Sequence, residues 1–212
     1  MIREGAERFG VELLPEALDR IGRFLDLLGV WNRRLRLTGT LDSATIVRKH
    51  VVDSLAPVPE LPSAGPVVDV GSGAGFPGIV IACVRPEVSL VLLEVRRRRV
   101  SFLRDAIRSI PLPAAEALEM RAEDAAHHPG LAGRASAVIA RALRLEVFLG
   151  LAAPLLASGG LAIAMQTPRT LAGAAASAGR RGLRLLATHP YTLPGGERRS
   201  LALFTPSLPP VP

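Results

Sequence analysis

Apolar residues between Pro15 and Leu35 recur at three- and four-residue steps, and this spacing predicts an amphipathic helix. The apolar positions are Leu18, Ile21, Leu25, Leu28, Trp31 and Leu35. A second helix is predicted to begin near Ser43 and to end before Pro57, because prolines at 57, 59 and 62 interrupt the pattern. Residues 1–62 are therefore predicted to form an N-terminal helical cap.

After residue 62, short apolar runs typical of buried strands alternate with helical segments. The predicted strands are 67–70, 88–94, 115–120, 135–140, 161–165, 183–187 and 200–205. The predicted helices are 79–84, 96–109, 145–156 and 171–180. This alternation indicates an α/β domain over residues 63–205, with a mostly parallel seven-stranded sheet covered by helices on both faces. The proline-rich residues 206–212 are predicted to be a disordered tail.

Composition limits the classes of protein that need to be considered. The chain has 212 residues and is 49% hydrophobic, which suits one α/β domain with a modest extension and excludes wholesale disorder. Cys83 is the only cysteine, so no internal disulfide is possible and a cytoplasmic setting is expected. The charged N-terminus contains no apolar signal-peptide core. The uncharged residues 147–168 are interrupted by Pro154 and by Ser158-Gly159-Gly160, so no membrane span is predicted.

The formal net charge is +7, and this surplus favours a polyanionic partner such as a nucleic acid. Lys49 is the only lysine among the basic residues. A bias in codon composition is therefore an alternative source of the arginine excess, and charge alone does not decide between the two explanations.

The stretch from Val67 to Gly78 reads as a buried strand, a glycine-rich turn and a helix start, and it predicts a site for a nucleotide-like ligand. In one register, Gly73 to Gly78 matches the G-x-G-x-x-G pattern of dinucleotide-binding proteins. In the other, Asp69 precedes Gly71, Gly73 and Gly75, as in sites for S-adenosylmethionine (SAM). A carboxylate at this place repels a pyrophosphate and attracts an ammonium or sulfonium group, so the second register is favoured.

Other candidate ligand-binding residues follow the predicted strands, since ligands of open α/β sheets bind outside the carboxyl ends of the strands. Glu94 ends the second strand, where its carboxylate suits the ribose hydroxyls of NAD and of SAM equally. Ala122 and Glu123 follow the third strand and are placed next to an adenine. Arg141 follows the fourth strand on the same edge.

The remaining patterns do not indicate another chemistry. His127 and His128 are adjacent and have no partners at ligand spacing, so no metal site is predicted. A serine–histidine–acid arrangement is not suggested by any motif. A NAD(P)-dependent oxidoreductase remains an alternative on the glycine pattern and Glu94, although Asp69 and the basic charge argue against it.

Several segments, in this order, resemble the RsmG (GidB) family of bacterial methyltransferases, which act on N7 of a guanine in 16S ribosomal RNA. The segments are Trp31-Asn32, Leu37-Thr38, the run from Arg48 to Leu55, Gly71 to Gly78, Arg97 to Leu103, Arg121-Ala122-Glu123, Ala140-Arg141-Ala142 and Gly196-Glu197-Arg198. The resemblance runs from about Val11 to Phe204. It implies a Rossmann-like fold, SAM as the methyl donor, and small-subunit ribosomal RNA or a ribosomal particle as the partner of a monomer.

The resemblance also implies where the ligands lie. With the motif residues above, the expected cofactor-binding set is Asp69, Gly71, Gly73, Gly75, Phe76, Glu94, Ala122, Glu123 and Arg141. The substrate-side candidates are His50, Asp53, Ser54 and Arg141. The basic residues expected to contact RNA phosphates are Arg33, Arg34, Arg36, Arg48, Lys49, Arg96, Arg97, Arg98, Arg99, Arg198 and Arg199.

Two departures from the family pattern stand out. Arg36 precedes Leu37-Thr38 where the family usually has asparagine, and Gln166-Thr167 stands where the family usually has Lys-Gly at the end of the fifth strand. The second departure leaves open a non-catalytic relative that binds SAM or RNA. Methylation of N7 uses an in-plane lone pair and removes no proton, so we expect positioning to dominate and no single catalytic residue.

Overall fold

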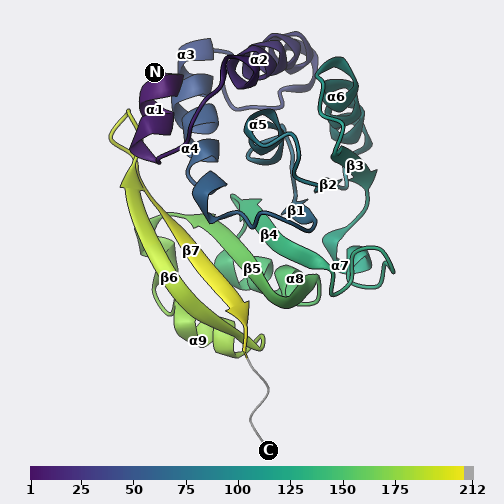
Figure 1. The fold of residues 1–212 in the computed structure, drawn as a ribbon, viewed down its shortest axis with the longest axis vertical. Coiled ribbons are helices and arrows are strands. Elements are labelled where there is room, and N and C mark those ends of the chain that lie inside the picture. Colours follow the sequence, from purple (N-terminus) through teal and green to yellow (C-terminus); the bar gives the residue numbers. More distant parts are fainter. Residues whose placement is uncertain (208–212) are drawn as a thin grey trace, which may run out of the picture.

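In the computed structural model, which describes residues 1–207, a seven-stranded sheet crosses the molecule in the order β3-β2-β1-β4-β5-β7-β6 (Figure 1). The strands are β1 (Val67–Val70), β2 (Leu90–Glu94), β3 (Ala115–Glu119), β4 (Ala135–Arg141), β5 (Leu156–Gln166), β6 (Leu183–Thr192) and β7 (Arg198–Pro206). Strands β1 to β5 pair in parallel, whereas β7 is antiparallel to β5 and to β6. The predicted mostly parallel sheet is confirmed.

Helices cover both faces of this sheet. The α-helices are α1 (Ile2–Arg8), α2 (Pro15–Leu35), α3 (Ser43–Ile46), α4 (Val52–Leu55), α5 (Gly78–Val84), α6 (Arg97–Ser109), α7 (Ala122–Ala125), α8 (Leu145–Ala152) and α9 (Ala174–Gly179). The shorter helical segments are η1 (Val47–Val51), which is π-helical, and the 3₁₀ turns η2 (Val58–Glu60) and η3 (Pro168–Leu171). Buried residues of α2, α5 and α6 pack on one face, and those of α7, α8 and α9 on the other.

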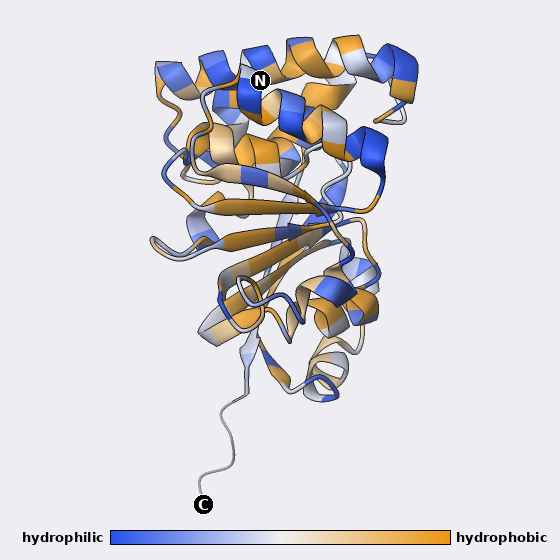
Figure 2. Cartoon of the chain, turned by 90° about the vertical axis from the view of Figure 1, so that its right-hand side faces the viewer, coloured by the Kyte–Doolittle hydropathy of each residue, from blue (hydrophilic) through white to orange (hydrophobic). Residues whose placement is uncertain are grey.

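The strands are apolar on both sides because each side meets a helical layer. Val67 and Leu90 belong to the core cluster on the α5 face, while Val68 and Val91 belong to the cluster on the α8 face. Figure 2 shows the result, with hydrophobic strands at the centre and mixed hydrophilic and hydrophobic positions on the outer helices. Alternate strand residues thus stabilise two separate cores.

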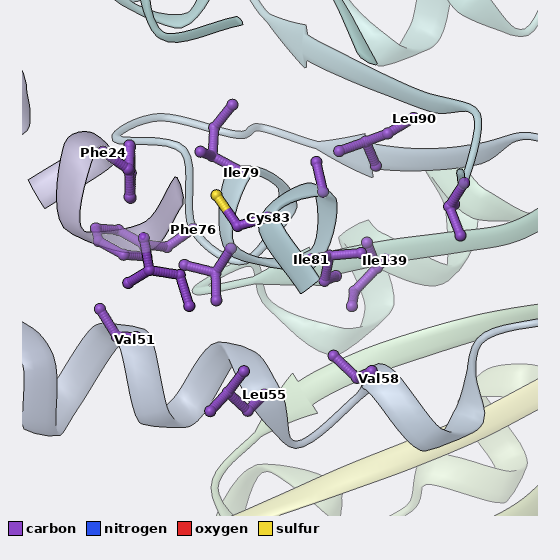
Figure 3. Packing of buried hydrophobic residues seen from close by; sticks show 14 of the residues in the cluster. Phe24, Val51, Leu55, Val58, Phe76, Ile79, Ile81, Cys83, Leu90 and Ile139 are labelled. Atoms are coloured by element: carbon purple, nitrogen blue, oxygen red, sulfur yellow. The ribbon is translucent and has the colours of Figure 1, made fainter. Parts of the chain in front are cut away.

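The N-terminal helices share their core with the sheet domain. Four buried side chains lie around α5, namely Phe24 of α2, Val51 of η1, Leu55 of α4 and Phe76 (Figure 3). The elements α3, η1 and α4 follow one another directly and form the second helical stretch of the chain. All four side chains are buried and belong to the same cluster as the β1 and β2 residues of this face. The domain boundary at residue 62 remains a prediction, and the side chains of the N-terminal helices and of the sheet domain pack into one shared core.

Most predicted elements are present, with differences at their ends. The helix at Pro15–Leu35 has the predicted bounds, but Phe24 and Asn32 are buried on it while Leu25 is only partly buried. Helix α8 ends at Ala152, so the predicted helix at 145–156 is too long. Strand β5 then begins earlier than predicted because Leu156 pairs with Ala135 of β4, and the register is irregular before pairing resumes at Leu161 and Ala137.

At the C-terminus, the hairpin of β6 and β7 is longer than predicted. Pro206 pairs with Leu183, and the backbone N–H of Ser207 donates to the carbonyl of Gly182 at 2.8 Å. The prediction of a tail beginning at 206 is therefore wrong for these two residues, and residues 208–212 lie outside the described part of the chain. Helix α1 and the short helix α7 had no predicted counterpart.

Within residues 1–207, no helix has both the length and the apolar character needed to cross a bilayer. The uncharged stretch at 147–168 is divided between α8 and β5. The expected helix-then-strand arrangement of this stretch is confirmed.

Candidate functional site

The glycine-rich loop lies between the carboxyl end of β1 and the start of α5. Gly71, Gly73 and Gly75 all have a positive φ, at 74°, 55° and 85°. Side chains with a Cβ rarely adopt this conformation, so the loop depends on glycine. The backbone N–H groups of Gly71 and Ser72 donate to the carbonyl of Leu93 at 2.9 and 3.0 Å, which fixes the loop on the end of β2.

The buried side chain of Asp69 is hydrogen-bonded to the backbone at the end of this loop. Its side chain is 1% exposed, and Oδ2 accepts a hydrogen bond from the N–H of Gly78 at 3.1 Å. Burial raises the pKa of Asp69 to about 7, although the Gly78 hydrogen bond acts in the opposite direction. Oδ2 is thus occupied by the backbone at the start of α5, and a contact of Asp69 with a cofactor's ammonium group stays a prediction.

Glu94 connects the loop to the start of α6. Oε2 accepts from the N–H of Gly73 at 3.0 Å, and Oε1 accepts from the N–H of Arg96 at 2.8 Å. The Arg99 guanidinium lies 3.7 Å from Oε2. Each carboxylate oxygen retains a second lone pair, so the predicted contact with ribose hydroxyls is compatible with these hydrogen bonds.

The other predicted cofactor residues lie at the same edge of the sheet. Ala122, which is buried, and Glu123, which is exposed, begin α7 directly after β3. Arg141 is the last residue of β4. Since β1 to β4 are parallel, their carboxyl ends bring these residues to the edge that carries the glycine loop.

Phe76 joins this edge to the second helical stretch. Its ring stacks on His50 at a centroid distance of 5.2 Å and meets the edge of Phe24 at 5.3 Å. The Arg141 guanidinium lies 5.2 Å from the ring centroid. Phe76 is 4% exposed and its ring makes these three contacts, while its contact with a cofactor stays a prediction.

His50 belongs to the π-helical turn η1, a type of irregularity often found at functional sites. Burial, with the positive charges of Arg141, Arg199 and Lys49, lowers the pKa of His50 to about 4, so its imidazole is neutral at pH 7. Its Nδ1 is buried without a hydrogen-bond partner among residues 1–207. The hydroxyl of Ser54 donates to the His50 carbonyl at 2.6 Å, which makes the serine a support of this turn.

Asp53 lies at the centre of a polar network between three distant elements. Tyr191 of β6 donates its hydroxyl to Oδ1 at 2.8 Å, and Nη1 of Arg141 lies 3.4 Å from Oδ2. Burial lowers the pKa of Arg141 and raises that of Tyr191. Tyr191 is absent from the predicted site, since nothing in its local sequence relates it to Asp53. Tyr191 is the only tyrosine in the chain, and no sequence motif indicated a role for it.

A cleft of about 720 Å³ opens beside this network. Its walls include Lys49, His50, Asp53, Arg141, Gln166, Tyr191 and Arg199. The substrate-side candidates His50, Asp53 and Arg141 are therefore brought together, whereas Ser54 lies behind His50. Among residues 1–207, Nε of Arg199 is also buried without a partner.

Gln166 ends β5 inside this cleft. Its Nε2 donates to the carbonyl of Leu143 at 2.9 Å, and its Oε1 accepts from the hydroxyl of Thr170 at 2.8 Å. The amide therefore has a fixed position. Ala142, which also lines this cleft, has φ at 65°, a strained conformation for a residue with a Cβ.

The predicted RNA-binding residues form two separate groups. Arg48, Lys49, Arg198 and Arg199 gather where the hairpin of β6 and β7 meets η1, and Lys49 is paired with Glu197 at 2.9 Å. Arg33, Arg34, Arg36 and Arg96 to Arg99 lie at the end of α2 and the start of α6. Most of this second group lines a smaller cleft of about 380 Å³.

The sheet order and the loop define a Rossmann-like methyltransferase fold. M. jannaschii TYW2 in complex with AdoMet matches with a TM-score of 0.60 and 15% identity, over 75% of this chain and 76% of that chain. Precorrin-6y C5,15-methyltransferase from Geobacter metallireducens GS-15 matches with a TM-score of 0.52 and 16% identity, over 73% and 86%. At these identities the likeness concerns the fold.

The sequence relatives are more specific. The profile of the family described as "GidB: rRNA small subunit methyltransferase G" matches residues 17–181. "Ribosomal RNA small subunit methyltransferase G" of Symbiobacterium thermophilum is 36% identical, over 96% of this chain and 88% of the relative. The protein of the same name from Myxococcus xanthus is 34% identical, over 94% and 93%. The chain belongs to the rRNA small subunit methyltransferase G family.

Proposed function

We propose that this protein transfers a methyl group from SAM to N7 of a guanine in small-subunit (16S) ribosomal RNA. Family membership over most of the chain is the observation that carries the proposal. The same membership decides between the two cofactors that the glycine pattern allows, in favour of SAM over NAD(P). The choice of N7 rests on the resemblance to the RsmG family.

The glycine loop fits a cofactor of this size and charge. A Cβ built on Gly71 would meet nothing within 4 Å, so a ligand has open access to the backbone there. The residues that would hold the ligand around this opening are Gly73, Glu94, Ala122, Glu123 and Arg141. SAM supplies a methyl group on a positively charged sulfur, which leaves as a neutral thioether. The carboxylate of Glu94 at the opening suits the cationic donor.

The substrate cleft suits a base that loses no proton. His50 is neutral near pH 7, and the chemistry at N7 requires no general base. His50 and Arg199, whose Nδ1 and Nε are buried without a partner among residues 1–207, both line this cleft. Asp53 offsets the charge of Arg141, which matters because methylation leaves a positive charge on the base. Positioning is thus the main contribution of these residues.

A non-catalytic relative remains the second candidate. The observation that favours it is Gln166-Thr167, where the resemblance implies Lys-Gly. The two hydrogen bonds of Gln166 hold an uncharged amide in a fixed position at the end of β5. This ordered cleft wall favours an active enzyme over an inactive one.

The partner and setting follow from the proposed substrate. The protein would act as a monomer on ribosomal RNA or on a ribosomal particle. A cytoplasmic location is part of the proposal, because ribosomal subunits of bacteria are assembled there.

The decisive experiment incubates the protein with methyl-labelled SAM and small ribosomal subunits that lack the modification. Label in the RNA at N7 of a guanine supports the proposal. SAM binding measured by calorimetry, without transfer of label, would identify the non-catalytic relative. Binding of NADH but not SAM would overturn both.

A further inference from the structure

The smaller cleft lies between the end of α2 and the start of α6. It is lined by Arg34, Leu35 and Arg36 from α2 and by the four residues Arg96 to Arg99. In the sheet order, β2 and its following helix α6 lie on one side of β1, whereas the strands that line the larger cleft, β4, β5, β6 and β7, lie on the other side. The two clefts therefore flank the glycine loop.

The positive charge of this cleft is largely uncompensated. Within residues 1–207, Arg99 is the only one of its arginines in an ion pair, and that pair is long, at 3.7 Å to Glu94. Arg34, Arg36, Arg96, Arg97 and Arg98 are exposed. Guanidinium groups held this close repel one another, and a bound anion removes that repulsion.

The chain bears local costs to place arginines here. Arg36 ends α2 with φ at 47°, a left-handed conformation that glycine or asparagine adopts more readily. The first turn of α6 contains arginines and no acidic residue, although positive charge is unfavourable at this end of a helix. These costs fall on two segments far apart in sequence whose side chains line one cleft. Neither cost improves the fold, which points to a function for the cleft.

We propose that this arginine cleft binds a phosphate group of the RNA backbone that carries the target guanine. The proposal rests on the proposed function, because it assigns a second contact to the same RNA. Arginine suits this ligand, since its planar group can donate two parallel hydrogen bonds to phosphate oxygens. Arg99 both lines the cleft and approaches Glu94, which holds the N–H of Gly73. The anchored phosphate therefore lies beside the cofactor loop, on the side opposite the base.

The test measures binding of a labelled single-stranded oligoribonucleotide at several salt concentrations. The cleft variant combines Arg36→Asn, which suits the left-handed backbone, with Arg97→Gln on the surface of α6. The control combines Arg134→Gln and Arg184→Gln, which remove the same charge from exposed positions outside both clefts. If the cleft variant loses two phosphate contacts, the slope of log K against log salt becomes shallower by about 1.4. This corresponds to about 20-fold weaker binding near 0.1 M salt, and the control keeps the wild-type slope.

Thermal unfolding of the cleft variant is expected at or above the wild-type temperature, which excludes misfolding as the cause of weaker binding. Equal slopes for the cleft variant and wild type, or an equal loss in the control, would overturn the cleft proposal. Methyl transfer to small subunits by the wild type is measured in parallel. Transfer without a slope change rejects the cleft and leaves the proposed function standing, whereas absent transfer rejects the proposed function itself.

Discussion

Asp69→Asn tests the role of the buried carboxylate beneath the glycine loop. Asparagine has nearly the same shape, and its carbonyl oxygen can accept the hydrogen bond from the N–H of Gly78. The substitution removes the ionisable group and leaves the loop support in place. We therefore expect its effect to appear in the pH dependence of stability.

The sign follows from the direction of the pKa shift. Burial raises the pKa of Asp69 from 3.8 to about 7, so the folded chain binds this proton more tightly than the unfolded chain. The stabilisation from this group is complete below pH 3.8 and is lost as the pH rises through 7. Between pH 4.5 and 7.5, the linkage relation gives a loss of about 3 kcal/mol in the free energy of unfolding.

The assay is urea unfolding of wild type and Asp69→Asn at pH values between 4.5 and 7.5. The difference between the two proteins isolates Asp69, because other groups titrate in both. This matters for His50, whose lowered pKa gives the opposite slope, with stability present above pH 6.5 and lost as the pH falls through about 4. A wild-type-minus-variant difference that stays constant, or that rises with pH, would refute the buried, protonated carboxylate.

Three further substitutions test the site. Gly73→Val, at φ 55°, should lower the affinity for SAM at least about tenfold in calorimetry. The control Gly159→Val, at φ 74° on β5, bears similar backbone strain and should bind SAM normally, so equal affinities of the two variants would refute the loop assignment. Tyr191→Phe leaves Oδ1 of Asp53 without its donor, so we expect about 1–2 kcal/mol of lost stability and a lower kcat/KM for RNA, and unchanged values for both would contradict the network. Gly78→Ala places a methyl group against Leu92 and 2.6 Å from Oδ2 of Asp69, so we expect urea unfolding to reveal a loss of about 1–3 kcal/mol. Wild-type stability would show that the close packing is wrong.

The two clefts on either side of the glycine loop give a simple division of tasks for the proposed reaction. The larger cleft combines polar groups with paired charges, Asp53 with Arg141 and Lys49 with Glu197, and also contains Arg144 and Arg199. The smaller cleft holds mostly unpaired arginines. Base and backbone of an RNA strand differ in the same way, one being neutral and polar and the other charged.

Local pattern was enough to predict the sheet and much of its edge. Helix α2 and the strand ends at Val70 and Glu94 follow from periodicity and from glycine placement, which depend on neighbours in sequence. Parallel pairing then brings the carboxyl ends to one edge, so Gly73, Glu94 and Arg141 could be grouped without coordinates. The end of α8 and the start of β5 could not, because Leu156 joins the strand by pairing with Ala135 of β4, ahead of a register irregularity before Leu161.

The alternating order of strands and helices, the glycine loop and the strand ends at Glu94 and Arg141 follow from local sequence patterns. The directions of the side chains depend on packing. Asp69 hydrogen-bonds to Gly78 beneath the loop, Asp53 meets Tyr191 from the distant hairpin, and the arginines at the end of α2 line one cleft with those that begin α6. Strand and helix formation depend on residues a few positions apart, whereas these contacts join segments that are brought together when the helices pack on the sheet.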